Sequence, residues 1–255
     1  MRAGLGSEAA TGRGGDPVAW HDAENGGFTA DLPLFERLAA ERDGRIADLG
    51  AGTGRVSLQL AAAGHAVTAV DFEQTLLEAL RRRAADRGLE VGTACADVRS
   101  LRVDERFSLV LAPMQLLHIL GGATGRRRML ASVRRHLEPG GRLCAVVVAE
   151  PLPVGSGRPE PVPDVREADG WTHSSLPVEV TIAPGTLTMV RLRQLVAPDG
   201  TLTESRHEVH LDRFSLAELD RDSDAAGLWI VGCDRLPSTL EYEDSVAIMM
   251  EARDG

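Results

Sequence analysis

The chain has 255 residues, 43% of them hydrophobic, and a formal net charge of −10 at pH 7. This length and composition suit a globular protein with one large domain, or one domain with a sizeable insertion. The acidic balance argues against nucleic acid or an anionic membrane as a partner, because both repel a negative surface. All 28 basic residues are arginine, which excludes a P-loop and a lysine Schiff base.

The sequence indicates neither a metal site nor a membrane span. Cys95, Cys144 and Cys233 lie far apart in strand-like apolar runs, and no Cys-x-x-Cys or Cys/His ligand spacing occurs. We therefore expect no metal, and three buried thiols in a cytoplasmic protein. The longest apolar run, Leu143–Ala149, is too short for a membrane helix, and the glycine-rich residues 1–17 lack the apolar centre of a signal peptide.

Strand-like and helix-like patterns alternate over the first 150 residues. Strands are predicted at Arg45–Leu49, Ala66–Asp71, Val91–Ala96, Phe107–Ala112 and Arg142–Ala149. Helices are predicted at Arg55–Ala63, Glu73–Arg87 and Arg126–Leu137, with a turn at Glu138–Gly141. Repeated strand–helix–strand units predict a doubly wound, mostly parallel α/β sheet, whose ligands bind beyond the carboxyl ends of the strands.

The pattern changes after residue 150. Residues 151–170 hold five prolines and three glycines, which predicts a linker or surface loop. From Val178 to Leu211 the periodicity is close to two, with a turn at Ala197–Gly200, as in a long antiparallel hairpin. A helix at Ser215–Ala226 and strands at Trp229–Arg235 and Ser245–Met250 follow. The predicted organisation is a flexible tail (1–17), a core (18–150), an antiparallel β insertion after the fifth strand (151–211), and a C-terminal part that completes the core sheet (212–255).

Three glycines, Gly50, Gly52 and Gly54, follow the first predicted strand. A tight strand-to-helix turn explains one of them but hardly three, since each glycine inside an element costs about 0.5–1 kcal/mol relative to alanine. The dinucleotide fingerprint G-x-G-x-x-G fits poorly, because Arg55 stands where its third glycine belongs. In a third interpretation, the glycines leave the backbone without side chains so that a ligand can lie against it. The acid before them, Asp48, suits a ligand that carries an ammonium group.

The run Asp48-Leu49-Gly50-Ala51-Gly52-Thr53-Gly54 resembles motif I of the class I S-adenosylmethionine (SAM)-dependent methyltransferases. Asp71 ends the second predicted strand, Asp97 follows the third, and the segment HLEPGGRL at 136–143 is similar to the turn before the fifth strand of that family. The resemblance implies a Rossmann-like fold with a seven-stranded sheet, SAM as the cofactor and S-adenosylhomocysteine (SAH) as the product.

The resemblance also implies roles for single residues. Asp48 is expected to face the SAM amine, and Asp71 the ribose hydroxyls. Asp97 and the backbone N–H of Val98 are expected to contact the adenine. The remaining expected cofactor contacts come from Gly50, Ala51, Gly52, Gly54, Phe72 and Pro113.

The segment VAWHDAENGGFTADLPLFERLA at 18–39 is similar to the N-terminal helix of the small-molecule branch of this family. That helix often carries an aromatic–Asp pair that folds over the cofactor. Trp20 and Phe28 are the expected lid residues and substrate contacts. In this chain the pair is interrupted, since His21 separates Trp20 from Asp22.

Methyl transfer is an in-line displacement, so the protein mainly has to hold the acceptor near the methyl group and exclude water. The stretch after the fourth strand, LAPMQLLHIL at 111–120, borders the methyl group in this family, and Gln115 and His118 are its polar side chains. His118 is predicted to act as a base or to orient the acceptor, with Gln115 beside it and Met114 lining the substrate. The alternative for His118 is a histidine hydrogen-bonded to backbone.

The insertion offers further polar side chains. Under strict alternation Arg206, Glu208 and His210 share one face of a strand and His207 lies on the other. Arg206 and His207 are predicted substrate contacts, against the alternative of a solvated strand face. The arginine runs 81–83 and 126–128 are predicted to be solvated helix faces.

The predicted function is SAM-dependent methylation of a small molecule in secondary metabolism, favouring N-methylation of an amine, with O-methylation nearly as well supported. Two alternatives stay open: a non-methylating SAM-dependent cyclase or pericyclase on the same fold, and a non-catalytic SAM-binding protein. The expected partner is a small-molecule substrate, without nucleic acid or membrane, and the protein is expected to be a monomer or homodimer.

Overall fold

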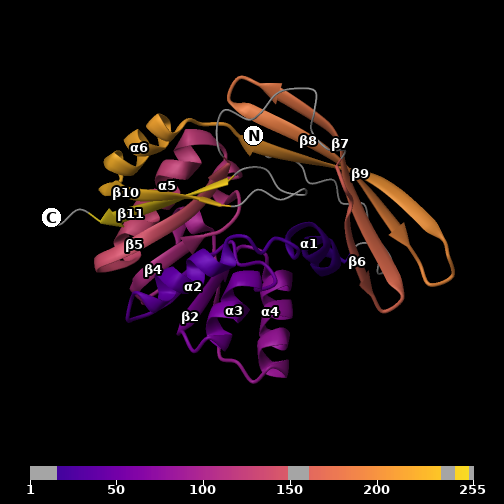
Figure 1. Ribbon diagram of the computed structural model, residues 1–255, viewed down its shortest axis with the longest axis horizontal. Helices are drawn as coiled ribbons and strands as arrows, with labels where there is room; N and C mark the ends of the chain where they lie inside the picture. The colour runs from indigo at the N-terminus through magenta and orange to yellow at the C-terminus, as the bar shows by residue number, and fades with distance from the viewer. Residues whose placement is uncertain (1–15, 149–160, 237–244, 253–255) are drawn as a thin grey trace.

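A computed structural model describes residues 16–148, 161–236 and 245–252. A seven-stranded sheet in the order β10-β11-β5-β4-β1-β2-β3 forms its larger part (Figure 1). The strands are β1 (Ile46–Leu49), β2 (Val67–Asp71), β3 (Gly92–Cys95), β4 (Phe107–Ala112), β5 (Leu137–Val148), β10 (Leu228–Leu236) and β11 (Ser245–Ala252). The first five pair in parallel, and β11 runs antiparallel to both β5 and β10. This confirms the predicted doubly wound, mostly parallel α/β fold.

Helices cover both faces of this sheet, which explains why β1, β2 and β4 are buried along their whole length. The helices are α2 (Leu32–Ala40), α3 (Arg55–Ala62) and α4 (Gln74–Asp86) on one face and α5 (Gly122–His136) and α6 (Leu216–Ala225) on the other (Figure 1). Leu109 and Leu111 of β4 belong to the core under α2 and α3, whereas Val110 and Ala112 belong to the core under α5 and α6. Successive residues of β4 therefore pack into the cores on opposite faces of the sheet.

The strand order reverses beside β1, which pairs with β2 on one side and β4 on the other. A doubly wound sheet opens a crevice at such a point, beyond the carboxyl ends of the strands. The loops after β1, β2 and β4 border it, together with two short 3₁₀ helices, η2 (Val98–Ser100) and η3 (Leu116–His118).

The insertion is a separate four-stranded antiparallel sheet, not a hairpin alone (Figure 1). Its strands are β6 (Asp164–Ala168), β7 (Trp171–Ala183), β8 (Thr186–Val196) and β9 (Leu202–Asp212). The loop predicted at 151–170 is therefore wrong from Asp164 onward, because the prolines end before β6 and the Asp169–Gly170 turn joins it to β7. Residues 151–160 of that predicted loop, and Ala149 at the end of the strand predicted before it, lie outside the described residues.

The N-terminal segment forms two helices, not one. Helix α1 (Pro17–Asn25) begins at Asp16, whose side chain accepts a hydrogen bond from Val18 N, and ends before the Gly26–Gly27 pair that precedes α2. The predicted tail at 1–17 is corrected at its end, where Pro17 opens the helix; residues 1–15 lie outside the described residues. In Figure 1, α1 lies between the core sheet and the insertion sheet.

Some predicted details differ. Helix α5 begins at Gly122 and not Arg126, and it follows Gly121, whose backbone is in the left-handed conformation. The turn predicted at 138–141 is an irregularity inside β5. Cys144 is buried as predicted, but Cys95 and Cys233 are exposed because they lie on outer strands of the sheet. In the described ranges, no helix is both long and apolar enough to cross a membrane.

Candidate functional site

The loop between β1 and α3 has a backbone that demands glycine at alternate positions. Gly50, Gly52 and Gly54 have φ angles of 67°, 53° and 95°, in the left-handed region that disfavours other residues. A Cβ on Gly54 would lie 2.7 Å from Cγ of Leu80, so this glycine lets α3 pack closely on α4. Gly50 and Ala51 donate their backbone N–H groups to the carbonyl of Val70 on β2, which anchors the loop to the sheet.

Asp48, on β1 just before the loop, is a buried carboxyl with one unused oxygen. Its Oδ2 accepts a hydrogen bond from Ser57 Oγ at 2.6 Å, whereas its Oδ1 has no hydrogen-bond partner among the described residues. Burial raises the pKa of Asp48 to about 6, and the hydrogen bond from Ser57 opposes that rise. A buried, unpartnered oxygen costs stability unless a donor reaches it, so Asp48 suits an ammonium group or a water that bridges to one.

Asp71, at the end of β2, holds the glycine loop in place. Its Oδ2 accepts from Gly52 N and its Oδ1 from Glu73 N, both at 2.8 Å. Each carboxylate oxygen has a second lone pair, so two acceptor positions remain for hydroxyl groups. Phe72 follows directly and is 75% exposed, which leaves an aromatic face beside the loop for a flat ring to cover.

Asp97 precedes η2, and its carboxylate is bonded to Arg99 within that short helix. Nε of Arg99 donates to both carboxylate oxygens at 2.9 and 3.0 Å, and these hydrogen bonds hold the pKa of Asp97 below its usual value. The pair is about two-fifths exposed, so a ligand can still reach the carboxylate. Val98 is buried beneath it.

Helix α1 lies directly on the glycine loop through His21 and Asp22. A Cβ on Gly52 would lie 2.2 Å from Nε2 of His21, so the imidazole fills the space that only glycine leaves open. Asp22 accepts from Thr53 Oγ1 at 2.7 Å and forms an ion pair with Arg83 of α4. His21 has no role in the sequence-based prediction, although His21, and not Trp20, directly precedes Asp22 in the chain.

The two expected lid residues lie elsewhere. Trp20 packs edge-on against His173 of the insertion, with 4.9 Å between ring centroids, and the Arg193 guanidinium lies 4.9 Å from its ring. Phe28 is 4% exposed and belongs to the core beneath α2. Trp20 faces the insertion because it lies one residue before His21, a rotation of about 100° around α1. Phe28 follows the Gly26–Gly27 pair and packs into the core.

The loop after β4 approaches the crevice from the other side of β1. Pro113 is buried, and Met114 has a φ of 51°, a conformation that is uncommon for a residue with a side chain and concentrates at functional sites. Gln115 is half-buried and opens η3. Leu116 packs within 3.1 Å of the position of a Cβ on Gly50, which brings this loop against the glycine loop.

His118 is fully enclosed and bonded through both ring nitrogens. Nδ1 lies 2.7 Å from the carbonyl oxygen of Asp212, at the end of β9, and Nε2 accepts from Val148 N at 3.1 Å. The ring stacks on Phe214 with 4.4 Å between centroids, and 3% of the residue is exposed. Because a carbonyl requires a donor and an N–H requires an acceptor, the ring is neutral with its proton on Nδ1. This geometry favours the backbone-bonded alternative for His118.

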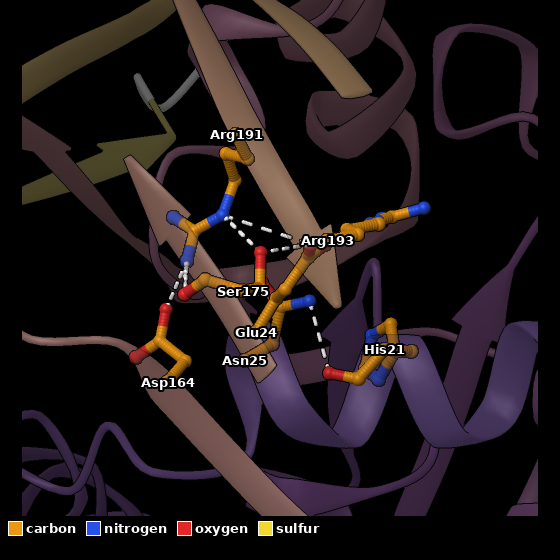
Figure 2. A network of polar contacts seen from close by, with 7 residues as sticks. All are labelled: His21, Glu24, Asn25, Asp164, Ser175, Arg191 and Arg193. Atoms are coloured by element: carbon orange, nitrogen blue, oxygen red, sulfur yellow. Dashed lines mark hydrogen bonds and ion pairs between the residues drawn. The ribbon is translucent and has the colours of Figure 1, made fainter. Parts of the chain in front are cut away.

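A polar network joins α1 to the insertion sheet (Figure 2). Glu24 accepts from Nε and one terminal nitrogen of Arg193, each at 2.7 Å, and from Ser175 Oγ at 2.7 Å. Arg191 donates to the same Ser175 Oγ at 2.7 Å and pairs with Asp164 of β6. Three of the four insertion strands are thereby tied to one helix.

Strand β9 shows the predicted alternation, so its two expected substrate contacts point apart. His207 pairs with Arg191 across the β8–β9 ladder on the face toward α1, where burial, followed by the charges of Arg193 and Arg191, lowers its pKa. Arg206 pairs with Leu192 and is exposed on the opposite face. Of the two, only His207 faces α1.

The prediction that the arginine runs 81–83 and 126–128 are solvated helix faces is partly wrong. Arg126 is 3% exposed, pairs with Asp222 of α6 and lies 4.1 Å from the ring of Phe214. Arg83 pairs with Asp22, as described above. In both cases the guanidinium pairs with a buried acid that lies far away in the sequence, Asp22 for Arg83 and Asp222 for Arg126.

Comparison with known proteins agrees with this geometry. Residues 46–141, from β1 to the irregularity in β5, match the methyltransferase domain family. A cypemycin N-terminal methyltransferase from a Streptomyces species is 36% identical over 100 residues, which are 39% of this chain and 40% of that protein. A ubiquinone biosynthesis O-methyltransferase from Coxiella burnetii is 27% identical over 113 residues, which are 44% of this chain and 47% of that protein. The matches thus span less than half the length of these relatives.

The fold extends beyond the matched region. The sugar N-methyltransferase KedS8 from a Streptoalloteichus species superposes on the chain with a TM-score of 0.74, covering 100% of both chains at 16% sequence identity. At this identity the likeness is one of fold, and it includes the insertion sheet as well as the core.

Proposed function

We propose that this chain transfers the methyl group of SAM to a small-molecule acceptor, because residues 46–141 match the methyltransferase domain family. The observation that carries the proposal is Asp48: a buried carboxyl oxygen without a partner, at the foot of a loop with three left-handed glycines. The cofactor supplies an activated methyl group on a sulfonium. Among the residues present, Asp48 suits its ammonium group, Asp71 its ribose hydroxyls, and Phe72 with Asp97 its adenine.

The chain's own contribution is positioning, because in-line transfer requires an aligned acceptor and a site that excludes water. We assign Met114 and Gln115 to the acceptor side, since their loop meets the glycine loop through Leu116. His118 acts as a positioning residue and not as a base, because its nitrogens hold the ends of β5 and β9 together. The insertion sheet closes the site from the side of α1, with His207 on its inner face.

An amine is the favoured acceptor. The net charge of −10 suits an amine that arrives as a cation. Such an amine has to lose its proton before its lone pair can attack the methyl group, and water can accept that proton, so an enzymatic base is not required. The N-terminal methyltransferase relative and the fold shared with a sugar N-methyltransferase support the same choice. O-methylation is the second candidate, supported by the ubiquinone-pathway relative.

Product analysis tests the proposal. The full chain is incubated with SAM labelled in the methyl group and with a panel of amines and hydroxylated compounds, and SAH is quantified. SAH formation with label in the acceptor supports methyl transfer. Conversion of an acceptor without SAH would establish a non-methylating enzyme, and tight SAM binding without turnover of any acceptor would favour a binding protein.

A further inference from the structure

His21 lies where a ligand in the glycine loop must meet it. Its Nε2 and Cε1 atoms lie 2.2 and 2.3 Å from the position that a Cβ on Gly52 would take. Helix α1 is held there by Asp22, through Thr53 and Arg83, so the backbone that carries His21 cannot leave the loop without breaking an ion pair. A cofactor that lies along the loop therefore contacts His21.

The hydrogen bonds around the ring define its protonation. Thr53 Oγ1 gives its hydrogen to Asp22 Oδ1 at 2.7 Å, so it can only accept from Nδ1 of His21, which lies 3.4 Å away. In the neutral ring the proton is then on Nδ1, and Nε2 carries a lone pair above Gly52. A ligand donor can bind that nitrogen directly, whereas a ligand carboxylate can bind it only after Nε2 gains a proton.

The partners of the other charged groups at the loop indicate which end of the cofactor contacts His21. Asp48 has the unpartnered oxygen that suits the ammonium group. Arg55 is engaged by Asp31 and by the carbonyl of Phe28, and Arg83 is engaged by Asp22. The carboxylate at the amino-acid end of the cofactor thus has His21 as the titratable nitrogen that faces the loop.

We propose that His21 is a cofactor-binding residue that takes a proton from solvent on binding and donates it, as an Nε2–H hydrogen bond, to the carboxylate of SAM or SAH. This inference rests on the proposed function and adds a residue and a proton to it. The step forms the Nε2–H bond with a proton that a hydronium ion or a buffer acid releases, and no bond of the cofactor breaks.

The pH dependence follows from the groups around the ring. Burial lowers the pKa of His21 in the free protein; Asp22 and Glu24 of α1 and Asp71 of β2 oppose that shift, and Arg83 of α4 adds to it. A bound carboxylate raises this pKa, so SAH binds more tightly at pH 6.5 than at pH 8. Asp48 acts in the opposite direction below about pH 6, where its carboxyl becomes neutral and loses the ammonium group.

Calorimetry of SAH binding at pH 7 tests the assignment. Each titration is repeated in two buffers with different ionisation enthalpies, which gives the number of protons bound per SAH. The wild-type chain should take up roughly half to one proton. His21→Gln, which keeps a donor that does not titrate, should take up none and bind SAH about tenfold more weakly, as expected for losing a charged hydrogen bond. His65→Gln, at the opposite end of β2, should match the wild type.

The outcomes separate this inference from the proposed function. SAH binding by the wild type without proton uptake, or uptake that persists in His21→Gln, would overturn the role of His21 alone. Failure of both the wild type and His65→Gln to bind SAH would overturn the proposed function and this role with it. A second readout is the Cε1–H resonance of His21 in histidine-labelled protein, whose titration midpoint should rise when SAH is added.

Discussion

Glu24 of α1 and Arg193 of β8 form a two-point ion pair, with both N···O distances at 2.7 Å. One helical turn earlier, His21 lies on Gly52. The same short helix therefore contacts the glycine loop at one position and the insertion sheet at the next turn. Helix α1 therefore connects the core sheet, through the glycine loop, to the insertion sheet.

Glu24→Gln should loosen the insertion sheet without unfolding the core. Arg191 and Arg193 would lose their shared acid, and losing a hydrogen bond to a charged group costs about 2 kcal/mol. Hydrogen exchange of β7 and β8 amides should accelerate, while β1 and β4 amides keep their protection. Glu208→Gln, an exposed acid on β9, is the control. Unchanged exchange in β7 and β8 would contradict the link.

The same contact should weaken in acid. Burial alone would raise the pKa of Glu24, but hydrogen bonds and charge from Arg193, with Ser175 and Arg191, hold it below the usual value of 4.5. A lowered folded-state pKa means that the stabilisation is present above pH 4.5 and is lost as pH falls through the folded value. In Glu24→Gln this acid-dependent part of β7–β8 protection should disappear.

Phe72→Ala should affect ligand binding and leave stability unchanged. The side chain is 75% exposed, so its removal costs the fold little, but an aromatic face worth about 1–3 kcal/mol in stacking against a base is lost. SAH affinity should fall about tenfold or more by calorimetry, with the same denaturation midpoint. Trp229→Ala, at another exposed aromatic residue, should change neither quantity. Equal SAH affinity in Phe72→Ala would remove Phe72 from the adenine site.

Asp48→Asn should stabilise the free protein while weakening cofactor binding. Burial raises the pKa of Asp48 to about 6, so in the folded chain the ionised form is the costly one. That cost is absent below about pH 4, grows as pH rises, and is complete above pH 6, where it amounts to about 3 kcal/mol. Denaturation curves at pH 8 should show this gain, and SAH affinity should drop.

Asp104→Asn, an exposed carboxyl before β4, controls for the loss of charge. A variant Asp48→Asn that is less stable than the wild type at pH 8 would mean that a donor already compensates the buried oxygen in the free protein.

Gly54→Ala should be costly for two separable reasons. Its φ of 95° strains any other residue by about 1–2 kcal/mol, and the added Cβ would lie 2.7 Å from Leu80 and 3.1 Å from Leu58. Crowding of that kind adds about 1–3 kcal/mol. Gly64→Ala has a φ of 92° and meets nothing within 4 Å, so it isolates the backbone part. Chemical denaturation should give a clearly lower free energy of unfolding for Gly54→Ala than for Gly64→Ala. Equal losses of stability in the two variants would exclude a packing role for Gly54.

His118→Ala should destabilise the chain by about 3 kcal/mol, because Val148 N–H and the Asp212 carbonyl both lose their partner. Thermal unfolding measures this loss, with His65→Ala as the control. With a methyl acceptor in hand, turnover should be slower at every pH without a change in the shape of the pH–rate profile. Loss of one limb of that profile would instead identify His118 as a base.

The sequence predicted the core because its signals are local. The glycine spacing, the acid that ends each of three successive strands, and the alternation of apolar strands with amphipathic helices are each visible within a short window. β4 was predicted at its observed limits, Asp48 directly precedes the glycine loop, and Asp71 bonds to Gly52 within it. Their contacts with the cofactor stay a prediction. The insertion was less predictable, since its first strand follows a proline-rich stretch that resembles a loop.

What the sequence by itself determined is the doubly wound sheet and the glycine loop at its switch point, since hydrophobic period and left-handed backbone positions are properties of neighbouring residues. Only the tertiary structure decided which side chain of α1 covers the loop, which arginines are buried and what His118 bonds. Those outcomes depend on pairs such as Asp22 with Arg83, Arg126 with Asp222 and Glu24 with Arg193, which lie 61, 96 and 169 residues apart. Rotation of a helix by one residue, about 100°, changes each such pair, and no local pattern specifies that rotation.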